Sequence, residues 1–310
     1  MSLPEGYSIR SPALDDVGAM DTVLLADDLV DTGQSDYDED FVRDQWSIPG
    51  FDPAEDAWLV LGPDGAVVAS GNVMPDGDER LKSWGLVHPA HRGLGIGSAL
   101  LDRMEARAAE RLAGVAGATL HHAIDDVDEA ARAMVLARGS AFVRSFRHMQ
   151  IDLDGPRDPG EPPPGIVIRG IDPERDLARA HAIFLEAFRE EWGYRVIPFE
   201  EWRGLEIEIP GFDAGLWLLA TEGGEPVGAL NAVVRGDRGW IGEFGVRRAW
   251  RGRGIGSALL RRSFATFAER GLPRVMLNVD FENPTGAMAL YEKVGMRVVR
   301  GFDVYEKPTG

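Results

Sequence analysis

The residues best suited to chemistry lie around a glycine-rich segment in the second half of the chain. Arg251-Gly252-Arg253-Gly254-Ile255-Gly256-Ser257 follows an apolar stretch, residues 240–246, and leads into an amphipathic stretch that ends near Glu269. A strand, a glycine turn and a helix in this order direct free backbone N–H groups toward a phosphate. Because glycines have no Cβ, the main chain can come close to a bulky anion. The segment therefore predicts a turn that binds a diphosphate.

The same segment occurs once more, earlier in the chain. Arg92-Gly93-Leu94-Gly95-Ile96-Gly97-Ser98 precedes Ala99-Leu100-Leu101, so residues 95–101 repeat residues 254–260 letter for letter at an offset of 159. A short strand candidate at Ile9-Arg10 has its counterpart at Ile168-Arg169, at the same offset. The chain is therefore predicted to be one fold, duplicated.

Hydrophobic periodicity predicts the same order of elements in both halves: a strand, two helices, three strands, a helix, a strand, a helix and a strand. In the first half we expect strands at 7–10, 57–61, 66–73, 80–87, 118–123 and 141–153, and helices at 14–30 and 37–46. In the second half we expect strands at 168–169, 216–220, 226–234, 240–246, 275–280 and 296–305, and helices at 172–192 and 199–207. Each half is thus an α/β domain with a mixed, mostly antiparallel sheet flanked by helices.

A proline- and glycine-rich stretch, residues 154–165, separates the halves and reads as a semi-rigid linker. It divides the chain into an N-terminal domain at 1–153 and a C-terminal domain at 166–310. A length of 310 residues, 44% of them hydrophobic, is enough for two cores. The chain has no cysteine, which excludes disulfides, thiolate catalysis and cysteine metal sites.

The charge of the chain bears on its partners. A net charge of −18 argues against a nucleic-acid groove and against an anionic membrane surface. No signal peptide or long apolar run is apparent, so we expect a cytoplasmic protein. Residues 1–155 carry 28 acidic and 12 basic side chains, whereas residues 156–310 carry 23 and 21. An anionic ligand is therefore expected in the second half, where arginines surround the glycine turn: Arg247, Arg248, Arg251 and Arg253.

The first glycine turn has fewer cationic neighbours, namely Arg92 with His88 and His91. Two further histidines, His121 and His122, are adjacent on an expected strand, so their side chains point to opposite faces and cannot hold one ion together. We therefore predict no metal site.

Each half resembles the GNAT superfamily of acyl-CoA-dependent N-acyltransferases. The family signature, Arg/Gln-x-x-Gly-x-Gly/Ala after a strand, stands here as Arg92-x-x-Gly95-x-Gly97 and Arg251-x-x-Gly254-x-Gly256. Residues 283–296 also resemble the last helix of that family. The resemblance covers nearly the whole chain apart from the linker, and the tandem arrangement is similar to that of mycothiol synthase.

The resemblance implies an acetyl-CoA site in the second half. There the strand before the glycine turn splays from its neighbour, and the pantetheine arm binds along Phe244, Gly245 and Val246, with Arg247 and Arg248 next. The pyrophosphate is expected on the N–H groups of residues 252–257. Asn278 is expected to contact the pantetheine, and Asn283 the adenosine end.

The resemblance also implies the catalytic groups. Tyr291 matches the general acid that protonates the departing thiolate of coenzyme A, although an aromatic side chain could also pack this helix onto the sheet. The usual position of the base, eleven residues before the motif, is Trp240 here. Glu243, on the same strand, is our candidate for the base, and a salt bridge to a nearby arginine is the alternative. Asp280, Glu282 or a water molecule are substitutes.

The first half departs from the family pattern where chemistry is expected. Val135 stands opposite Tyr291, His122 opposite Asn278, Val127 opposite Asn283 and Trp84 opposite Glu243. We therefore expect this half to be non-catalytic. It either binds coenzyme A or serves only as a scaffold, and in the first case the contacts are expected from Val87, Arg92, Gly93, Gly95, Gly97 and Ser98.

Two classes of function follow. The first is an N-acetyltransferase that transfers acetyl from acetyl-CoA to the primary amine of a small molecule, with mycothiol synthase-like acetylation of a thiol-bearing amine as a variant. The second is a coenzyme A-binding sensor or interaction protein without turnover. We expect the amine to bind among carboxylates and aromatic side chains of the second half, which a solvated helix face would explain equally well: Glu186, Phe188, Glu190, Glu191, Trp192, Tyr194 and Trp202.

Overall fold

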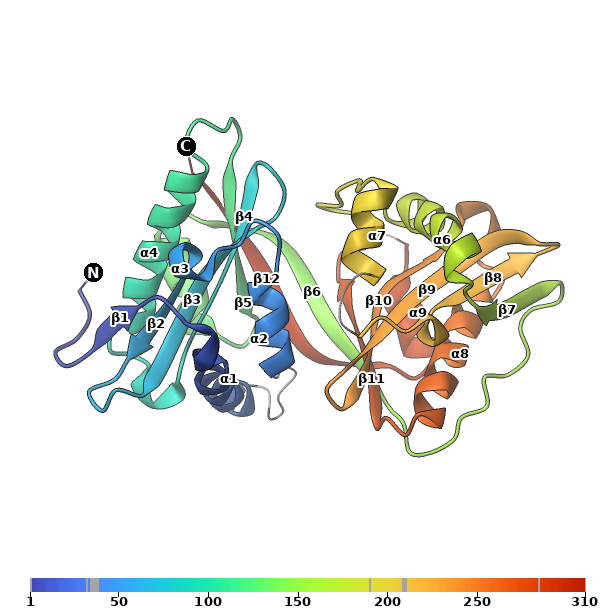
Figure 1. Ribbon diagram of the computed structural model, residues 1–310, viewed down its shortest axis with the longest axis horizontal. Coiled ribbons are helices and arrows are strands. Elements are labelled where there is room, and N and C mark those ends of the chain that lie inside the picture. Colours follow the sequence, from blue (N-terminus) through green and yellow to red (C-terminus); the bar gives the residue numbers. More distant parts are fainter. Residues whose placement is uncertain are drawn as a thin grey trace. The chain divides into compact units, whose positions relative to one another are not determined.

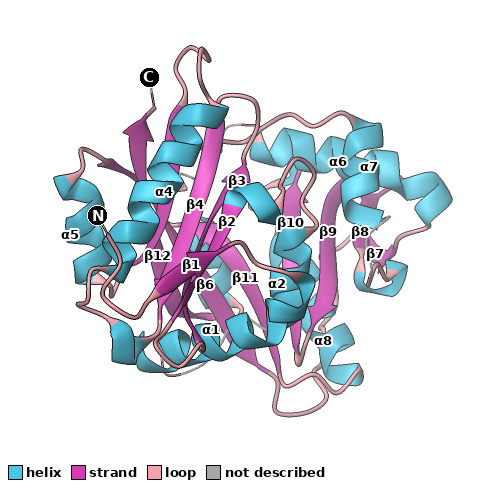
Figure 2. Cartoon of the chain, turned by 60° about the vertical axis from the view of Figure 1, so that its left-hand side comes forward, coloured by secondary structure: helices cyan, strands magenta, loops and turns pink. Residues whose placement is uncertain are grey.

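The computed structural model describes residues 2–31, 33, 39–189, 191–207, 211–283 and 285–309. The chain forms two compact units. Unit 1 comprises Met1–Phe146 and Arg300–Gly310, and unit 2 comprises Arg147–Val299. Figure 1 follows the elements along the chain, and Figure 2 distinguishes the strands from the helices that lie against them.

The sheet of unit 1 has the strand order β1-β2-β3-β4-β5-β12. Its strands β4 and β5 run parallel, and the other pairs are antiparallel. Gly85 of β4 lies against Met104 of α4, whereas the next residue, Leu86, packs with Leu24 of α1, so these two helices cover opposite faces. The elements are β1 (Ser8–Arg10), β2 (Ala57–Leu61), β3 (Val67–Pro75), β4 (Arg80–Val87), β5 (Thr119–Asp125), β12 (Arg297–Pro308), α1 (Val17–Asp31), α2 (Glu39–Trp46), α3 (Pro53–Asp56), α4 (Ile96–Arg111) and α5 (Glu129–Ala137).

The sheet of unit 2 has the matching order β7-β8-β9-β10-β11-β6. Gly245 of β10 packs so closely on α6 that an added Cβ would lie 2.6 Å from Ala187 Cβ. Its neighbour Phe244 instead lies over Gly256 of α8 on the other face. The elements are β6 (Ala141–Asp152), β7 (Ile166–Gly170), β8 (Leu218–Glu222), β9 (Glu225–Arg235), β10 (Arg238–Val246), β11 (Arg274–Asp280), α6 (Pro173–Phe188), α7 (Phe199–Ile207), α8 (Ile255–Glu269) and α9 (Ala287–Lys293).

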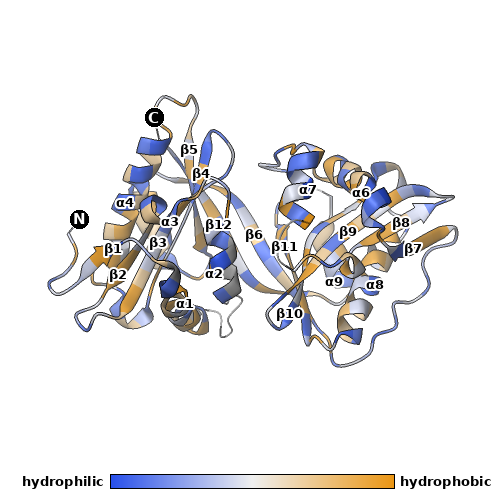
Figure 3. Ribbon diagram, in the orientation of Figure 1, coloured by the Kyte–Doolittle hydropathy of each residue, from blue (hydrophilic) through white to orange (hydrophobic). Residues whose placement is uncertain are grey.

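The predicted fold class and the predicted order of elements are confirmed. Strands β2 and β4 and helix α7 have the predicted bounds, while the short helix α3 was not predicted. Part of the helix expected at 37–46 lies outside the described residues. Figure 3 shows hydrophobic and hydrophilic residues alternating around α4 and α8, the pattern from which these helices were predicted. In the part of the chain that the structure describes, no helix combines the length and hydrophobicity needed to cross a bilayer.

The two units differ from the expected domains 1–153 and 166–310, because each unit contains part of a strand that was expected in the other domain. From Arg300 on, β12 belongs to unit 1, where it pairs antiparallel with β5 and buries Tyr305 in the core. The second part of β6 belongs to unit 2, where it buries Met149 and Ile151. Hydrophobic alternation predicts that a segment is a strand with one buried face, but it does not record which strand will lie beside it. The linker at 154–165 carries no helix or strand.

A buried ion pair fixes the start of this returning strand in unit 1. Arg300, with 4% of its side chain exposed, donates to Asp28 at 2.7 Å and to Asp125 at 2.6 and 2.7 Å. Removing one partner of a buried pair leaves the remaining charge desolvated without compensation.

We therefore expect Arg300→Met to lower the free energy of unfolding by about 3–5 kcal/mol in urea titrations followed by circular dichroism. The matched control is Arg297→Met, because Arg297 pairs with Asp152 at 2.9 Å while 57% of its side chain is exposed. That change should cost less than about 1 kcal/mol. Equal losses in both variants would show that the buried cluster does not hold the strand.

Candidate active site

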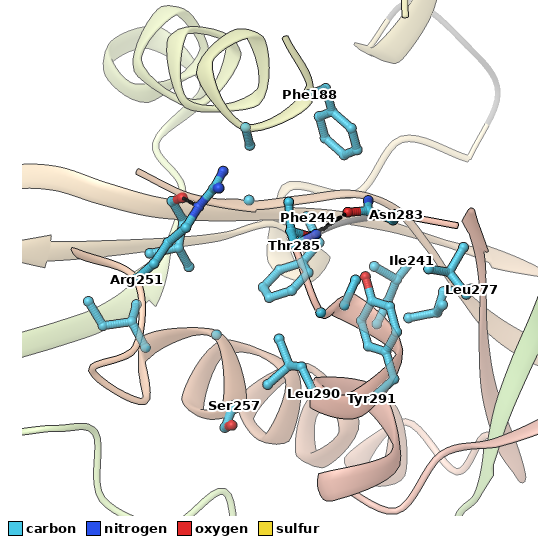
Figure 4. Close-up of a pocket in the computed structure, with 18 of the residues that line it drawn as sticks. Phe188, Ile241, Phe244, Arg251, Ser257, Leu277, Asn283, Thr285, Leu290 and Tyr291 are labelled. Carbon is cyan, nitrogen blue, oxygen red and sulfur yellow. Dashed lines mark hydrogen bonds between the residues drawn. The ribbon is translucent and has the colours of Figure 1, made fainter. Parts of the chain in front are cut away.

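A cavity of about 350 Å³ opens in unit 2 where β10 and β11 separate. The two strands pair in parallel from Gly239 to Ile241 on β10, and the pairing stops there. Beyond that point the side chains and the glycine turn line a cavity (Figure 4). Of the residues predicted to bind the cofactor or to catalyse, these line it, and Glu243 is not among them: Phe244, Gly245, Val246, Arg251, Gly252, Gly254, Ile255, Gly256, Ser257, Asn278, Asp280, Asn283 and Tyr291.

The glycine turn has the backbone that an anion site needs. Gly252 and Gly254 have φ angles of +74° and +81°, in the left-handed region that favours glycine. Gly254 is the N-cap of α8, and no side chain in the described structure caps this helix. Its first N–H groups and the positive end of its dipole are therefore available to an anion. A Cβ at Gly256 would meet Phe244 and Leu290 at 3.1 Å, so only glycine leaves this wall of the cavity undisturbed.

Tyr291 stands at the opposite side of the cavity, on α9. Only 8% of the residue is exposed, and its hydroxyl is directed toward the interior beside Ile241 (Figure 4). Burial, and secondarily the charge of Glu191, raises the pKa of Tyr291 above its usual value. The phenol is therefore protonated at neutral pH, as a proton donor must be.

Glu243 is positioned by a β-bulge in β10. Ile241 pairs with Ala232 of β9, but Phe244 pairs with Leu230, so β10 carries one extra residue between them. Gly242 occupies the bulge because a Cβ there would lie 2.6 Å from Asn231 Oδ1. The backbone N–H of Glu243 donates to this same oxygen.

The carboxylate of Glu243 is held by two side chains. Its Oε2 accepts from Trp202 Nε1 at 2.8 Å and from Asn231 Nδ2 at 3.2 Å. Among the described residues, no hydrogen-bond donor reaches Oε1, and Glu243 lies beside the cavity without lining it. The expected alternative, a salt bridge from Glu243 to a neighbouring arginine, is absent among the described residues.

A second carboxylate, Glu206 on α7, belongs to the same cluster. Asn231 Nδ2 donates to Glu206 Oε2 at 2.9 Å as well as to Glu243. Burial raises the pKa of Glu206 to about 7, against a lowering effect of Arg235. The pKa of Glu243 is also raised to about 7, first by burial and then by the charge of Glu206, while the bond from Trp202 lowers it. A carboxylate with a pKa near neutrality is well matched to removing a proton from an amine.

The residue pattern and the cavity agree with a comparison against known families. A model of the acetyltransferase (GNAT) family matches residues 23–139 and 177–296. The chain belongs to this family. It contains two GNAT regions, as the sequence motifs predict.

Known relatives extend this result. The mycothiol acetyltransferase of Streptomyces avermitilis is 34% identical over 215 residues, which are 68% of this chain and 66% of that protein, just under two thirds. The mycothiol acetyltransferase of Thermomonospora curvata is 32% identical over 256 residues, which are 81% of this chain and 78% of that protein. A GCN5-related N-acetyltransferase from Sphaerobacter thermophilus has a TM-score of 0.87 at 33% identity, covering 99% and 97% of the two chains. A tandem GNAT protein from the clavulanic acid biosynthesis pathway shares the fold, with a TM-score of 0.72 at 18% identity over 98% and 99%.

Three of the four predicted arginines in this member of the GNAT family, Arg247, Arg248 and Arg253, do not line the cavity. Arg247 pairs with Glu186 at 3.5 Å, and Arg253 pairs with Glu222. Arg251 does line it, and its Nε donates to the carbonyl of Val246 at 3.1 Å. This arginine therefore ties the turn to the end of β10.

The two predicted asparagines differ in their surroundings. Asn278 is exposed on β11, just past the point where the strands separate. Asn283 is held in place, because its Nδ2 donates to Glu191 at 2.8 Å and its Oδ1 accepts from the Thr285 N–H at 2.8 Å. Both side chains line the cavity.

The side chains expected around the amine are only partly brought together. Phe188 and Glu191 line the cavity, and Trp202 bonds Glu243. Burial, with the charges of Glu243 and Glu191, raises the pKa of Tyr194 to about 12. Glu186 is instead paired with Arg247, and Glu190 lies outside the described residues.

Unit 1 has an analogous cavity of about 450 Å³, which these first-half predictions line: Val87, Arg92, Gly93, Gly95, Gly97 and Ser98. The hydrogen bonds at the ends of the last helices confirm that Val135 takes the place of Tyr291. The Ser140 N–H donates to the Val135 carbonyl at 3.2 Å, as the Met296 N–H donates to the Tyr291 carbonyl at 3.0 Å. The register between β3 and β4 shows no bulge, and Trp84 lies in the regular ladder.

Sequence reasoning missed Glu206 and Asn231. Asn231 meets Glu243 at the bulge, and Glu206 bonds Asn231. The bulge has no sequence signal beyond Gly242 within an apolar strand. The available hints were two polar residues in otherwise apolar surroundings, Asn231 within an apolar strand and Glu206 near the end of an amphipathic helix.

The Glu206–Glu243 pair leads to a prediction about the pH dependence of kcat/KM. Glu243 must be deprotonated to accept a proton, so kcat/KM should fall as the pH drops through about 7. Replacing Glu206 by Gln removes a like charge and lowers the pKa of Glu243, so this acidic limb should move to lower pH. At pH 6, we expect Glu206→Gln to retain a several-fold larger share of its plateau activity than the parent does.

The measurement is a pH profile of coenzyme A release with the best amine from a panel. Glu200→Gln is the control, since Glu200 lies on the same helix with 81% of its side chain exposed and should leave the profile unchanged. A Glu206→Gln profile that keeps the parent midpoint would refute the electrostatic coupling.

Proposed function

We propose that unit 2 transfers the acetyl group of acetyl-CoA to the primary amine of a small molecule by direct attack of the amine. The observation that supports this most strongly is the cavity at the separation of β10 and β11, which has an uncapped glycine turn at one side and a buried tyrosine at the other. The free N–H groups of the turn suit a diphosphate, and the Cβ-free wall at Gly256 suits a close approach. Bound acetyl-CoA supplies the acetyl group as a thioester.

The residues of the chain then move two protons. Glu243 accepts a proton from the attacking amine at Oε1, directly or through a water molecule, because its Oε2 is engaged by Trp202 and Asn231. Tyr291 donates its phenolic proton to the sulfur that leaves. Protonation at that sulfur neutralises its charge as it forms, which lowers the barrier to its departure.

A second acceptor class is favoured by the relatives named as mycothiol acetyltransferases. The amine would then belong to a molecule that also carries a thiol. The same Glu243 and Tyr291 would serve both acceptors, so the two readings differ in the acceptor alone. A panel that contains matched amines with and without a thiol separates them.

Tyr291→Phe tests the acid. Loss of the proton donor should reduce kcat by roughly 10²–10⁴-fold, with little change in the Kd of coenzyme A, because the ring is retained. Tyr305→Phe is the control, since Tyr305 is also buried but lies in the core of unit 1. Steady-state turnover and isothermal titration measure the two quantities. Unchanged turnover in Tyr291→Phe would reject this residue as the acid.

Gly254→Val tests the turn. The φ of +81° is strained for valine, and its side chain would crowd the turn, so binding of coenzyme A to unit 2 should be lost. Undiminished binding of coenzyme A to unit 2 would show that the diphosphate does not bind at the second glycine turn.

A further inference from the structure

The cavity of unit 1 differs from that of unit 2 at its inner end. It reaches along α4 to three apolar side chains, Leu100, Leu101 and Met104. In unit 2, by contrast, the residues of α8 that line the cavity stop at Ser257. The cavity volume is correspondingly about 450 Å³ in unit 1 and about 350 Å³ in unit 2.

One substitution explains the difference. Phe244 stands 159 residues after Gly85, and its ring lies against Gly256 and closes this side of the unit-2 cavity. Gly85 has no side chain, so in unit 1 the wall at this point is Met104, whose Cε is 3.2 Å from where a Cβ would be. Methionine is flexible and polarisable, so it can adapt to an apolar chain beside it.

A buried polar atom stands where the unit-1 strands separate. His122 is 1% exposed, lines the cavity, and belongs to the last pair of the β4–β5 ladder with Ser83. Its Nδ1 lies 2.7 Å from Ser83 Oγ, while Nε2 has no partner in the described structure. Burial lowers the pKa of His122 to about 4, so the ring is neutral. The Ser83 hydroxyl has two acceptors within reach, His122 Nδ1 at 2.7 Å and the His121 carbonyl at 3.5 Å. We assign its proton to the shorter contact, with Nδ1, so that Nε2 carries the ring proton and needs an acceptor.

We infer that the unit-1 cavity is a binding site for an acyl-CoA whose acyl chain is longer than acetyl. The thioester carbonyl accepts from His122 Nε2, and the chain lies against Leu100, Leu101 and Met104. The diphosphate lies on the first glycine turn, where Gly93 and Gly95 have no atom within 4 Å of an added Cβ. Val135 offers no proton at the place of Tyr291, so the ligand is held and not consumed.

Electrostatics makes the acyl chain the main source of affinity at this site. Three carboxylates also line the cavity: Asp27, Asp125 and Asp128. Asp27 lies 2.7 Å from Arg92 and offsets the charge of the arginine that precedes the turn. Asp125 is likewise paired with Arg300, so the arginines near the cavity are offset by carboxylates and add little attraction for a diphosphate. Each buried methylene, by contrast, strengthens binding regardless of charge. A long acyl chain should therefore bind much better than acetyl here.

The test is a calorimetric titration of the full chain carrying Gly254→Val, with octanoyl-CoA, acetyl-CoA and octanoate as probes. We expect octanoyl-CoA to bind one site on the order of 50-fold more tightly than acetyl-CoA, which corresponds to about three buried methylenes. Octanoate alone should bind far more weakly. If Gly254→Val leaves a second site, that result bears on the proposed function of unit 2 and not on this inference.

Variants of unit 1 then assign the site. Gly85→Leu and His122→Leu should each weaken octanoyl-CoA at least about 10-fold, while His121→Leu, which changes the adjacent histidine on the other face, should not. If Gly85→Leu does not fold, Gly85→Ala decides, since it only displaces the flexible end of Met104. Equal affinity for octanoyl-CoA and acetyl-CoA, no loss in the Gly85 and His122 variants, or equally tight octanoate would each overturn the inference.

Discussion

The position of the Glu243 carboxylate in unit 2 depends on the amide of one buried asparagine. Asn231 accepts the backbone N–H of Glu243 and donates to the carboxylates of Glu243 and Glu206, so all of its hydrogen-bonding groups are used. This arrangement needs the extra residue in β10, because a regular ladder would leave the Glu243 N–H elsewhere. It also needs glycine at 242, where a Cβ would collide with the amide oxygen. The bulge in β10 and the hydrogen bonds that hold Glu243 therefore depend on each other.

Unit 1 shows what the same fold does without the irregularity. Asn72 occupies the place of Asn231 at the 159-residue offset and is 3% exposed. It faces Trp84 in an unbroken ladder, and its Oδ1 is buried without a hydrogen-bond partner in the described residues. A buried unpaired oxygen costs free energy. The asparagine therefore fits the bulged strand better than the regular one, and unit 1 retains it without the contacts that make it useful.

The sequence could predict the parts of this protein that depend on local patterns. The strands, the helices and the glycine turns all follow from periodicity and from residues with special backbone freedom. Tyr291 and Asn283 were expected at the site because the sequence resembles the GNAT family. The sequence could not predict which strand completes which sheet, because alternation records a buried face and not a neighbour. Glu206 was out of reach for a related reason. Glu206 is linked to Glu243 through Asn231, and the three residues lie on α7, β10 and β9, respectively. These elements are too far apart in the sequence for a local pattern to predict that they meet.

The arginines around the second glycine turn illustrate how a charge pattern can mislead. Four of them suggested a cationic pocket, yet Arg247 and Arg253 are paired with glutamates, and Arg251 donates to the carbonyl of Val246. Paired guanidinium groups attract a diphosphate less than free ones do, since each partner carboxylate repels it. The backbone N–H groups of the turn and the dipole of α8 have no such competitor among the described residues, because no side chain caps the helix. The proposed anion binding therefore rests on a backbone conformation that glycine permits, and the arginines contribute chiefly by holding the turn against the strands beside it.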